Sequence, residues 1–565
     1  MSNKVLVVGG VAGGASAAAR VRRLDESAEV IMFERGKNVS FSNCCLPYHL
    51  SGTVEKSDDL VLISPQEFKD KYNIDARTRN EVVDIKREEK KVVVKDLEAG
   101  EEYEEDYDKL ILSPGANPIC PGSIPGVEND NVFTVRNVQD ISKLNGYIQE
   151  NDIEDVAVVG AGFIGCEVAE NLRHAGKDVK LIEAQDQIMP PFDNDMAQIL
   201  HKELYDNGVE LVLEDAVKEI KDGHIILDSG AEVDAGAVVM AIGVCPETEL
   251  AERAGLEIGE TGSIKVDHNY RTNDKDIYAV GDAIEVYCRM TNEKTRLPLA
   301  GPAQRQARAA ADAIYDKDHT HNGIIGSSVV RIFDINAAST GINEKQAEAA
   351  GIPYDIVYVI PGDKVGLMPG SHPMHFKLIY EYPTGRILGA QAVGRGNVDK
   401  RVDVIATMIH MGGTLEDLKE LELCYAPVFG TAKDVVNHAA LVGLNLLNND
   451  YEQVEVTEVR ELVENDACII DVREEDEFAE GHIKNAVNIP LSELRDRVDE
   501  IPEDEPVYLH CRSGQRSYNA IRALQGMGYE NVYNISGSFL GICCHEYYLD
   551  QTTDREKIVT EYNFE

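Results

Sequence analysis

Val156-Ala157-Val158-Val159-Gly160-Ala161-Gly162-Phe163-Ile164-Gly165 is the stretch that decides the fold. Its four apolar residues predict a buried strand, and the glycines that follow predict a tight turn into a helix. Glycines let a backbone approach a pyrophosphate closely, and the helix N-terminus stabilises the negative charge. Glu183 ends the next apolar run, where a carboxylate can bind a ribose hydroxyl. The stretch therefore predicts a dinucleotide-binding fold.

The same acid indicates which dinucleotide is bound. A carboxylate at Glu183 repels a 2′-phosphate, and Ala184-Gln185 supply no arginine to receive one. This pattern favours NADH over NADPH.

An earlier copy of the pattern opens the chain. Val5-Leu6-Val7-Val8 leads into Gly9-Gly10-Val11-Ala12-Gly13-Gly14, and Glu34 ends the next strand-like run. Val11 stands where the second glycine of the fingerprint usually lies, so this copy alone is the weaker signal. Two copies with correctly placed acids make a chance glycine loop improbable, and they predict two nucleotide-binding folds.

Length and charge limit the class of protein. The chain has 565 residues, which predicts about three to five domains. Its 100 acidic and 55 basic residues argue against nucleic acid or an anionic membrane surface as a general partner. No apolar run is long enough to span a bilayer, and the N-terminus lacks the pattern of a signal peptide. The eleven scattered cysteines, an odd number, fit reduced thiols in the cytoplasm.

Ser40-Phe41-Ser42-Asn43-Cys44-Cys45-Leu46-Pro47-Tyr48 carries the first candidate for a reactive thiol. The segment follows a strand-like run and leads into a proline-containing helix start, so we expect Cys44 near a helix N-terminus. The helix dipole would there stabilise a thiolate, which is the nucleophilic form. Alternatively, Cys44 and Cys45 are small buried residues. A disulfide between these neighbours is unfavourable, because adjacent Cα atoms are only about 3.8 Å apart.

Two further motifs extend the first nucleotide fold across a long gap. Ser113-Pro114-Gly115 follows one apolar run, and Gly281-Asp282-Ala283 follows another. With these motifs the chain resembles the FAD-dependent pyridine nucleotide-disulfide oxidoreductases. The resemblance implies an FAD domain interrupted by an NADH domain, with Asp282 on the ribityl chain and a helix from Pro298 to Ala313 facing the flavin.

The resemblance also implies the residues of both dinucleotide sites. For FAD they are Gly9, Val11, Ala12, Gly13, Gly14, Glu34, Ser113, Gly115, Gly281, Asp282 and Ala303. For NADH they are Gly160, Gly162, Phe163, Ile164, Gly165, Glu183 and Gly243.

The cysteine motif resembles one branch of this family. His49 stands where members with two redox cysteines have the second one. The segment 40–48 is similar to the active-site motif of coenzyme A-disulfide reductases and coenzyme A-linked persulfide reductases, which have glycine at the position of Cys45. The branch also contains NADH peroxidases and oxidases that use a cysteine sulfenic acid. Those peroxidases carry a histidine where this chain has Ala12.

The same resemblance implies coenzyme A as a tightly bound ligand or substrate carrier. Ser40 and Asn43 would line its channel, and Arg20 and Arg23, three residues apart on one helix face, would bind its phosphates. The alternative for the two arginines is a solvated basic face.

From Gly326 to about Asn448 the chain resembles the dimerisation domain of the family, with Cys424-Tyr425-Ala426-Pro427 as its signature. The resemblance implies a homodimer in which Tyr425 reaches the active cysteine of the other subunit and can protonate a leaving thiol. Alternatively, Tyr425 is an ordinary interface aromatic. A second tyrosine of the family falls at Leu367, which cannot supply a proton.

The C-terminal region resembles a single-domain rhodanese. The resemblance rests on Ile469-Ile470-Asp471-Val472-Arg473, Gly481-His482-Ile483 and the segment from Val507 to Ser517. Cys511 follows a strand and precedes a helix, so the N–H groups of its loop can hold a persulfide anion. The loop residues are Arg512, Ser513, Gly514, Gln515 and Arg516.

The charges and other polar groups of this region have separate expected roles. Arg512 and Arg516 would lower the pKa of the Cys511 thiol. Asp471 and His482 are expected to be structural rather than catalytic. We expect Cys543 and Cys544 to be buried packing residues rather than a sulfur relay.

The expected fold class is α/β, with two nested Rossmann-like nucleotide-binding domains, an α+β dimerisation domain and a C-terminal α/β rhodanese domain. The expected ranges are 1–115 with 245–325 for FAD, 116–244 for NADH, 326–448 for dimerisation and 455–562 for the rhodanese. No metal site is expected.

The expected function is FAD-dependent, NADH-driven reduction of persulfides, polysulfides or disulfides of coenzyme A or related thiols. Cys44 would attack the sulfur–sulfur bond, and Cys511 would supply sulfane sulfur. The alternatives are an NADH oxidase or peroxidase with an attached sulfurtransferase, and a flavin-based redox sensor or sulfur carrier.

Overall fold

The computed structural model describes residues 3–317 and 323–564. Residues 1–2, 318–322 and 565 lie outside the described residues, and the first two of these segments fall inside the expected FAD ranges. The chain forms two compact units. The first unit is 1–184 with 215–324, and the second is 185–214 with 325–565.

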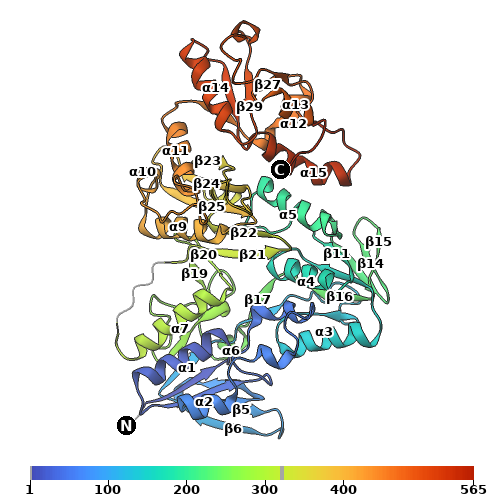
Figure 1. The fold of residues 1–565 in the computed structure, drawn as a ribbon. Helices are drawn as coiled ribbons and strands as arrows, with labels where there is room; N and C mark the ends of the chain where they lie inside the picture. The colour runs from blue at the N-terminus through green and yellow to red at the C-terminus, as the bar shows by residue number, and fades with distance from the viewer. Residues whose placement is uncertain (1–2, 318–322, 565) are drawn as a thin grey trace. The chain divides into compact units, whose positions relative to one another are not determined.

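A parallel sheet of order β18-β7-β1-β2-β3 forms the first half of the first unit (Figure 1). Its central strands are almost wholly buried, as expected for a parallel sheet covered on both faces. Helix α1 packs against helix α7. The strands are β1 (Lys4–Val8), β2 (Glu29–Glu34), β3 (Asp75–Thr78), β7 (Lys109–Leu112) and β18 (Ile277–Ala279), and the helices are α1 (Ala12–Leu24), α2 (Pro65–Tyr72) and α7 (Ala300–Ile314).

A second parallel sheet repeats this arrangement. Strand β10 lies between β11 and β16, and β9 lies beyond β16. The elements are β9 (Val132–Phe133), α3 (Val138–Glu150), β10 (Asp155–Val159), α4 (Phe163–His174), β11 (Asp178–Ile182) and β16 (Ala237–Met240). The glycine-rich stretches at 9–14 and 160–165 each join the first strand of a sheet to its first helix, which confirms the strand, turn and helix predicted at both.

The two sheets are joined by two chain segments that pair with each other. Strands β8 (Ala116–Pro118) and β17 (Val244–Pro246) form an antiparallel pair. Beside it, Glu247 accepts hydrogen bonds from Arg35 at 2.7 Å and from Arg136 at 2.9 Å. The second nucleotide fold is therefore inserted into the first through paired connections.

Smaller antiparallel elements complete the first unit. They are β4 (Asn80–Lys86), β5 (Lys91–Asp96) and β6 (Glu102–Asp106); β13 (Val217–Lys221), β14 (His224–Leu227) and β15 (Glu232–Asp234); and β19 (Val286–Tyr287) with β20 (Lys294–Thr295). Helix α6 is Glu249–Arg253.

The second unit contains a five-stranded antiparallel sheet of order β21-β22-β25-β24-β23. Its elements are β21 (Ser328–Ile332), β22 (Ile335–Gly341), α8 (Glu344–Ala349), β23 (Tyr354–Val359), β24 (Met374–Glu381), β25 (Ile387–Gly394), α9 (Val398–Met411), α10 (Leu415–Lys419) and α11 (Val435–Leu447). Helix α5 (Asn194–Asp206) and strand β12 (Val209–Val212) also belong to this unit.

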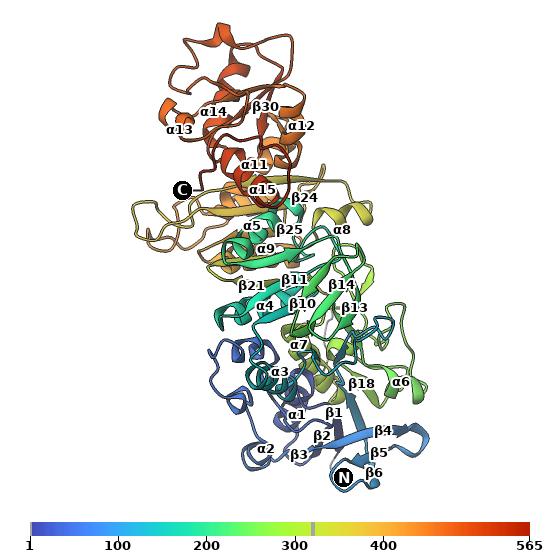
Figure 2. The same cartoon turned by 90° about the vertical axis from the view of Figure 1, so that its right-hand side faces the viewer.

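The C-terminal part of the second unit is a parallel sheet of order β26-β30-β29-β27-β28 (Figure 2). Its elements are β26 (Glu452–Val454), α12 (Val459–Glu464), β27 (Cys468–Asp471), α13 (Glu475–Glu480), β28 (Val487–Asn488), β29 (Val507–His510), α14 (Gln515–Gly526), β30 (Val532–Ile535) and α15 (Ser538–Thr552).

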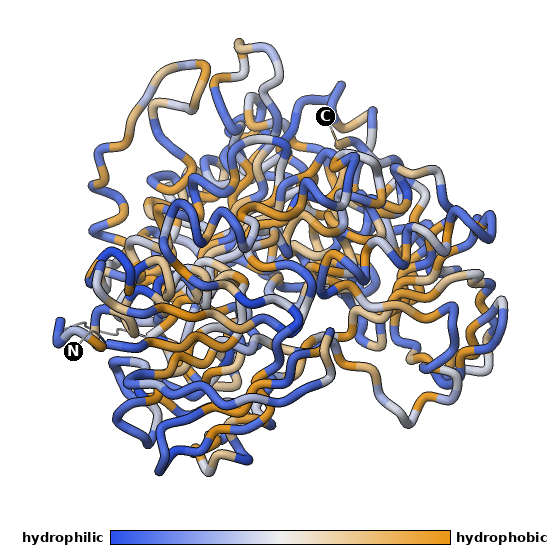
Figure 3. Tube along the Cα trace, turned by 90° about the horizontal axis from the view of Figure 1, so that it is seen from below, coloured by the Kyte–Doolittle hydropathy of each residue, from blue (hydrophilic) through white to orange (hydrophobic). Residues whose placement is uncertain are grey.

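Hydrophobic segments follow the strands of the sheets, and hydrophilic segments occupy the outer loops (Figure 3). Among the described helices, none has the length and apolar character needed to cross a bilayer.

A buried ion cluster holds α5 against the antiparallel sheet. The ammonium of Lys377, only 1% exposed, lies 3.0 Å from both carboxylate oxygens of Asp195 and 3.5 Å from Asp193, and it also contacts Glu344. These carboxylates raise the pKa of Lys377, although burial opposes them. The three acids lie close enough to bind a metal ion, but Lys377 already supplies the cation.

Replacing this lysine should destabilise the second unit. Lys377→Met would leave buried carboxylates without their cation, and breaking a buried pair in this way costs about 3–5 kcal/mol. We expect that loss in the free energy of unfolding measured with urea. Lys345→Met, at a nearby exposed lysine, should change it by less than about 0.5 kcal/mol. Equal stabilities for the two variants would contradict the assigned role of the cluster.

Candidate active sites

The two glycine turns have nearly the same backbone conformation. Gly9 and Gly160 have φ angles of +97° and +98°. A Cβ at Gly9 would lie 2.0 Å from the carbonyl oxygen of Ser113, and one at Gly160 would lie 2.6 Å from that of Ala241. Only glycine tolerates both the conformation and the contact.

A second close backbone contact also occurs in both turns. A Cβ at Gly14 would lie 1.8 Å from the carbonyl oxygen of Gly9, and one at Gly165 would lie 1.9 Å from that of Gly160. In each copy the first turn of the helix thus packs directly on the glycine that ends the strand.

The acid that follows each turn holds the turn in place. Glu34 accepts the N–H of Gly10 at 2.9 Å, and Glu183 accepts the N–H of Ala161 at 2.8 Å. The carboxylates therefore lie at the position where the ribose of a bound dinucleotide is expected.

The helix N-termini are open to a phosphate. Neither α1, capped by Val11, nor α4, capped by Gly162, has a side chain that bonds its first N–H groups. A Cβ at Gly162 would meet no protein atom within 4 Å, so this glycine leaves space rather than relieving a clash. Both turns fit a pyrophosphate.

Three of the other predicted cofactor residues, Ser113, Gly281 and Ala303, lie close together beside the first turn. Ser113 donates its N–H to Val8, and a Cβ on Gly281 would lie 3.6 Å from the Ser113 hydroxyl and 3.8 Å from Ala303. Asp282 is half-buried, and burial raises its pKa. Gly115 and Gly243 have φ angles of +79° and +117° and lie beside the paired connections β8 and β17.

One residue that holds this region together was not predicted from the sequence. Gln306, buried on α7, accepts the N–H of Gly281 at 2.8 Å. Helix α7 begins at Ala300, two residues after the predicted start. The sequence around Gln306 does not indicate this hydrogen bond, because its partner Gly281 lies 25 residues earlier.

Cys44 does not lie at the N-terminus of an α-helix, and that prediction is wrong. It lies inside the three-residue 3₁₀ turn η1 (Asn43–Cys45), which is followed by a second such turn, η2 (Pro47–His49). Turns this short have no appreciable dipole. Burial raises the pKa of the Cys44 thiol, and Glu167 and Cys45 add to the increase. The residue is nonetheless exposed in the single chain.

The residues around the turn explain its position. Turn η2 packs against α3 and α4. His49 contacts the carbonyl oxygen of Val54 at 2.9 Å and the side-chain amide of Asn145 on α3 at 3.5 Å. The residue at the second cysteine position of the family therefore fixes the turn.

The predicted coenzyme A residues are only partly free. Arg20 donates to Asp312 at 2.7 Å, so a phosphate would have to displace this carboxylate. Arg23 is exposed, whereas Arg22 between them is buried and bonded to backbone carbonyls.

Ser40 and Asn43 lie near the first glycine turn. Ser40 has a φ of +48° and donates its N–H to Gly10. Asn43 donates from its side chain to the carbonyl oxygen of Arg136 at 3.4 Å. Both polar side chains therefore lie on the segment that carries Cys44.

Tyr425 and Leu367 belong to the second unit. Tyr425 is 51% exposed and Leu367 is 87% exposed, and Cys424 is exposed as well. Such apolar exposure is typical of a surface that a second subunit covers.

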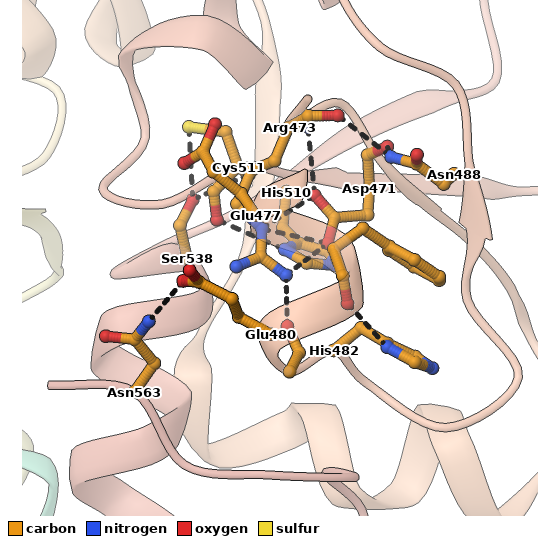
Figure 4. Close-up of polar contacts among 12 residues, drawn as sticks. Asp471, Arg473, Glu477, Glu480, His482, Asn488, His510, Cys511, Ser538 and Asn563 are labelled. Atoms are coloured by element: carbon orange, nitrogen blue, oxygen red, sulfur yellow. Dashed lines mark hydrogen bonds and ion pairs between the residues drawn. The ribbon is translucent and has the colours of Figure 1, made fainter. Parts of the chain in front are cut away.

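The second thiol, Cys511, lies in a closed loop between β29 and α14 (Figure 4). Its sulfur accepts the N–H of Gly514 at 3.1 Å, and the hydroxyls of Ser517 and Ser538 lie 3.7 and 4.0 Å away. Gly514 has a φ of +103°, which turns its N–H toward the sulfur. This set of donors suits an anionic sulfur.

The two loop arginines differ. Arg516 pairs with Glu477 at 2.5 and 2.7 Å, so a carboxylate offsets part of its positive charge. The expected effect of the two arginines on Cys511 stays a prediction. Arg512 has a buried Nη2 with no hydrogen-bond partner among the described residues. Ser513 is half-buried and Gln515, the first residue of α14, is exposed.

The motif residues Asp471, Arg473 and His482 bond to other protein groups (Figure 4). Asp471 and Arg473, both fully buried, form a bidentate ion pair with distances of 2.6 to 3.0 Å. His482 contacts the carbonyl oxygen of Phe478 and stacks on its ring.

The adjacent cysteines of α15 are also buried. Burial raises the pKa of Cys543 to about 11 and that of Cys544 to about 12. Both thiols are therefore protonated and enclosed, as expected for packing residues rather than nucleophiles.

Most of the chain matches models of known protein families. Residues 3–307 match the family model described as pyridine nucleotide-disulphide oxidoreductase, and 327–435 match the dimerisation domain of that family. Residues 455–543 match a rhodanese-like domain. The expected fold class is thereby confirmed.

Individual relatives agree with the family models. A coenzyme A disulfide reductase from Staphylococcus epidermidis is 34% identical over 77% of this chain and 98% of its own length. A structure of reduced Bacillus anthracis CoADR-RHD has a TM-score of 0.93 and 44% identity, covering 98% of this chain and 99% of that one. A NAD-dependent persulfide reductase from A. fulgidus has a TM-score of 0.90 and 37% identity, covering 95% and 99%.

Glu167 on α4 gives a testable electrostatic prediction. It is half-buried, burial raises its pKa to about 7, and its charge raises the pKa of Cys44. Above pH 7 the carboxylate is ionised and opposes a thiolate, so Glu167→Gln should speed alkylation of Cys44 by about two- to fivefold at pH 8. Below pH 6, where Glu167 is already neutral, the variant and the wild type should react alike.

The rate is read after timed exposure to iodoacetamide from fragment spectra of the peptide, which distinguish alkylation of Cys44 from that of the adjacent Cys45. Glu150→Gln, at an exposed acid on α3, is the matched control and should leave the rate unchanged at both pH values. A slower reaction in Glu167→Gln, or no pH dependence of the difference, would contradict this electrostatic account.

Proposed function

The chain belongs to the pyridine nucleotide-disulphide oxidoreductase family, and from this membership we propose that it uses NADH and FAD to reduce sulfur–sulfur bonds. The substrates are persulfides, polysulfides or disulfides of coenzyme A or a related small thiol. The relatives named coenzyme A disulfide reductase and persulfide reductase support this substrate class.

One observation carries the proposal: the chain holds two sulfur sites of different kinds. Cys44 is an exposed thiol on the nucleotide-binding unit, and η2 packs against the helix that follows the second glycine turn. Cys511 is a buried thiol whose sulfur accepts a loop N–H. The first suits reduction and the second suits the storage of an anionic persulfide.

The residues of the two glycine turns support the assignment of the cofactors. Glu34 and the open N-terminus of α1 would hold FAD, and Glu183 with the N-terminus of α4 would hold NADH. FAD, when bound, transfers two electrons from NADH to sulfur. The full sets of dinucleotide residues given above remain part of the proposal.

In the reaction the thiolate of Cys44 attacks the sulfur–sulfur bond of the substrate. A new bond forms to the Cys44 sulfur, and the leaving thiolate departs with the electron pair of the broken bond. Tyr425 of the partner subunit is proposed to donate the proton that the leaving thiolate takes. NADH supplies the two electrons that restore Cys44, and the sulfur released from a persulfide leaves as hydrogen sulfide.

Coenzyme A would bind along the segment that carries Cys44. Ser40 and Asn43 supply polar side chains there, and exposed Arg23 is available to a phosphate. Arg20 requires release from Asp312 first. We therefore assign the main phosphate contact to Arg23.

We also propose a homodimer in the cytoplasm, with domains at 1–115 with 245–325, 116–244, 326–448 and 455–562. The match to a dimerisation domain and the exposed Tyr425 and Leu367 support the dimer. All eleven cysteines are free, which supports a reducing compartment.

The test is anaerobic NADH oxidation with coenzyme A persulfide or polysulfide, and in separate assays with oxygen or peroxide. The wild type should release sulfide in proportion to the NADH consumed. Cys44→Ser should abolish this activity, because it removes the nucleophile. Cys511→Ser should keep turnover with coenzyme A persulfide but lose most turnover when thiosulfate is the sulfur source.

Two outcomes would overturn the proposal. Faster turnover with oxygen or peroxide, unaffected by Cys511→Ser, would indicate an oxidase with an attached sulfurtransferase. A single stoichiometric burst of NADH oxidation would indicate a redox sensor.

A further inference from the structure

Helix α15 is shared between the rhodanese sheet and the rest of the second unit. Eleven of its fifteen residues are buried, on all sides of the helix. It packs against α5 (Figure 1), and its Phe539 ring lies 4.0 Å from the guanidinium of Arg473. Because α15 is buried on all sides, it contacts both the rhodanese part and the rest of the second unit.

The N-terminus of α15 holds the loop that carries Cys511. Phe539 donates its N–H to the carbonyl oxygen of Cys511, and Leu540 donates to that of Arg512, both at 3.0 Å. The hydroxyl of Ser538 accepts the N–H of Cys511 at 3.3 Å. The position of the sulfur therefore depends on where α15 begins.

The first residues of this helix are strained. Gly537 and Ser538 have φ angles of +73° and +50°. A left-handed serine costs about 1–3 kcal/mol and persists only where its surroundings hold it. The groups packed around Gly537 and Ser538 therefore hold them in this conformation.

The ring of Tyr358, on strand β23 of the antiparallel sheet, supplies that support. A Cβ on Gly537 would lie 2.7 Å from the ring, and one on Gly541 would lie 3.4 Å from it. The backbone of α15 thus rests directly on the ring at two successive turns.

The ring itself is locked in place. Tyr358 is buried, and its hydroxyl lies 2.7 Å from Nδ1 of His375 on β24. The other ring nitrogen of His375 lies 3.9 Å from the sulfur of Cys544 on α15. Tyr358 and His375 therefore connect the antiparallel sheet to the N-cap of α15, Gly537, and to Cys544 within the helix.

We propose that Tyr358 is a positioning residue for the sulfurtransferase site, supplied by the dimerisation sheet rather than by the rhodanese fold. The inference rests on the proposed role of Cys511 as a sulfur carrier. It follows that the rhodanese loop reaches its working geometry only when docked on that sheet. Loss of the ring lets Gly537 and Ser538 relax, and the hydrogen bond from Cys511 to Ser538 lengthens.

The test measures sulfur transfer from thiosulfate to cyanide by the full chain. The Cys511 thiolate attacks the sulfane sulfur, and sulfite leaves with the electrons of the broken bond. Cyanide then takes the outer sulfur as thiocyanate and restores the thiolate. Tyr358→Leu should lower kcat about tenfold, as expected when a reacting atom is misplaced, with KM for thiosulfate changed less than twofold.

Two variants separate positioning from general damage. Tyr358→Phe keeps the ring and should retain at least half of the wild-type kcat. Tyr354→Leu, at the start of the same strand, should have no effect. NADH-driven reduction of coenzyme A disulfide should be unchanged in all three. If Tyr358→Leu yields no folded protein, Tyr358→Met carries the same expectation.

The outcomes are distinct. A wild type without sulfur transfer would overturn the proposed role of Cys511 itself. An active wild type with an equally active Tyr358→Leu variant would overturn the positioning role alone. A Tyr358→Phe variant as impaired as Tyr358→Leu would also overturn it, because the ring would then not be the support.

Discussion

The contact between a glycine and a neighbouring carbonyl is the constraint on which both nucleotide sites depend. At Gly9 and Gly160 the chain turns from a buried strand into a helix with a positive φ, close against the next strand of its sheet. No side chain fits there. The turn leaves the N-terminus of the helix open, and the acids Glu34 and Glu183 fix the loops from the far side. The result is two helix N-termini without a side-chain cap, which is the arrangement that suits a bound pyrophosphate.

These features were predictable because they are local. A glycine turn, its strand and its acid are encoded within about 25 residues, and the geometry that the turn requires admits few other residues. The rhodanese loop is similar, since Cys511 and its donor Gly514 are three residues apart. The strand, turn and helix around each glycine stretch could therefore be predicted from the sequence.

The errors and omissions involve partners that are distant in the sequence. Arg20 pairs with Asp312 and Arg516 pairs with Glu477, carboxylates that lie 292 and 39 residues away in the sequence, so neither ion pair was predicted. The effect of Glu167 on Cys44 depends on how α4 packs against η2. The proline was expected to start a helix after Cys44, but Pro47 begins a second three-residue 3₁₀ turn instead. None of these contacts leaves a periodic signal in the sequence.

The central claim is that sulfur taken up at Cys511 leaves the protein as sulfide with electrons from NADH. The direct measurement loads Cys511 anaerobically with isotopically labelled sulfane sulfur, removes the donor, and adds coenzyme A with limiting NADH. The account predicts one labelled sulfide released for each NADH consumed in the wild type. In Cys44→Ser it predicts label that stays on Cys511 or on coenzyme A persulfide. NADH consumption without labelled sulfide, or equal release from Cys44→Ser, would contradict the account.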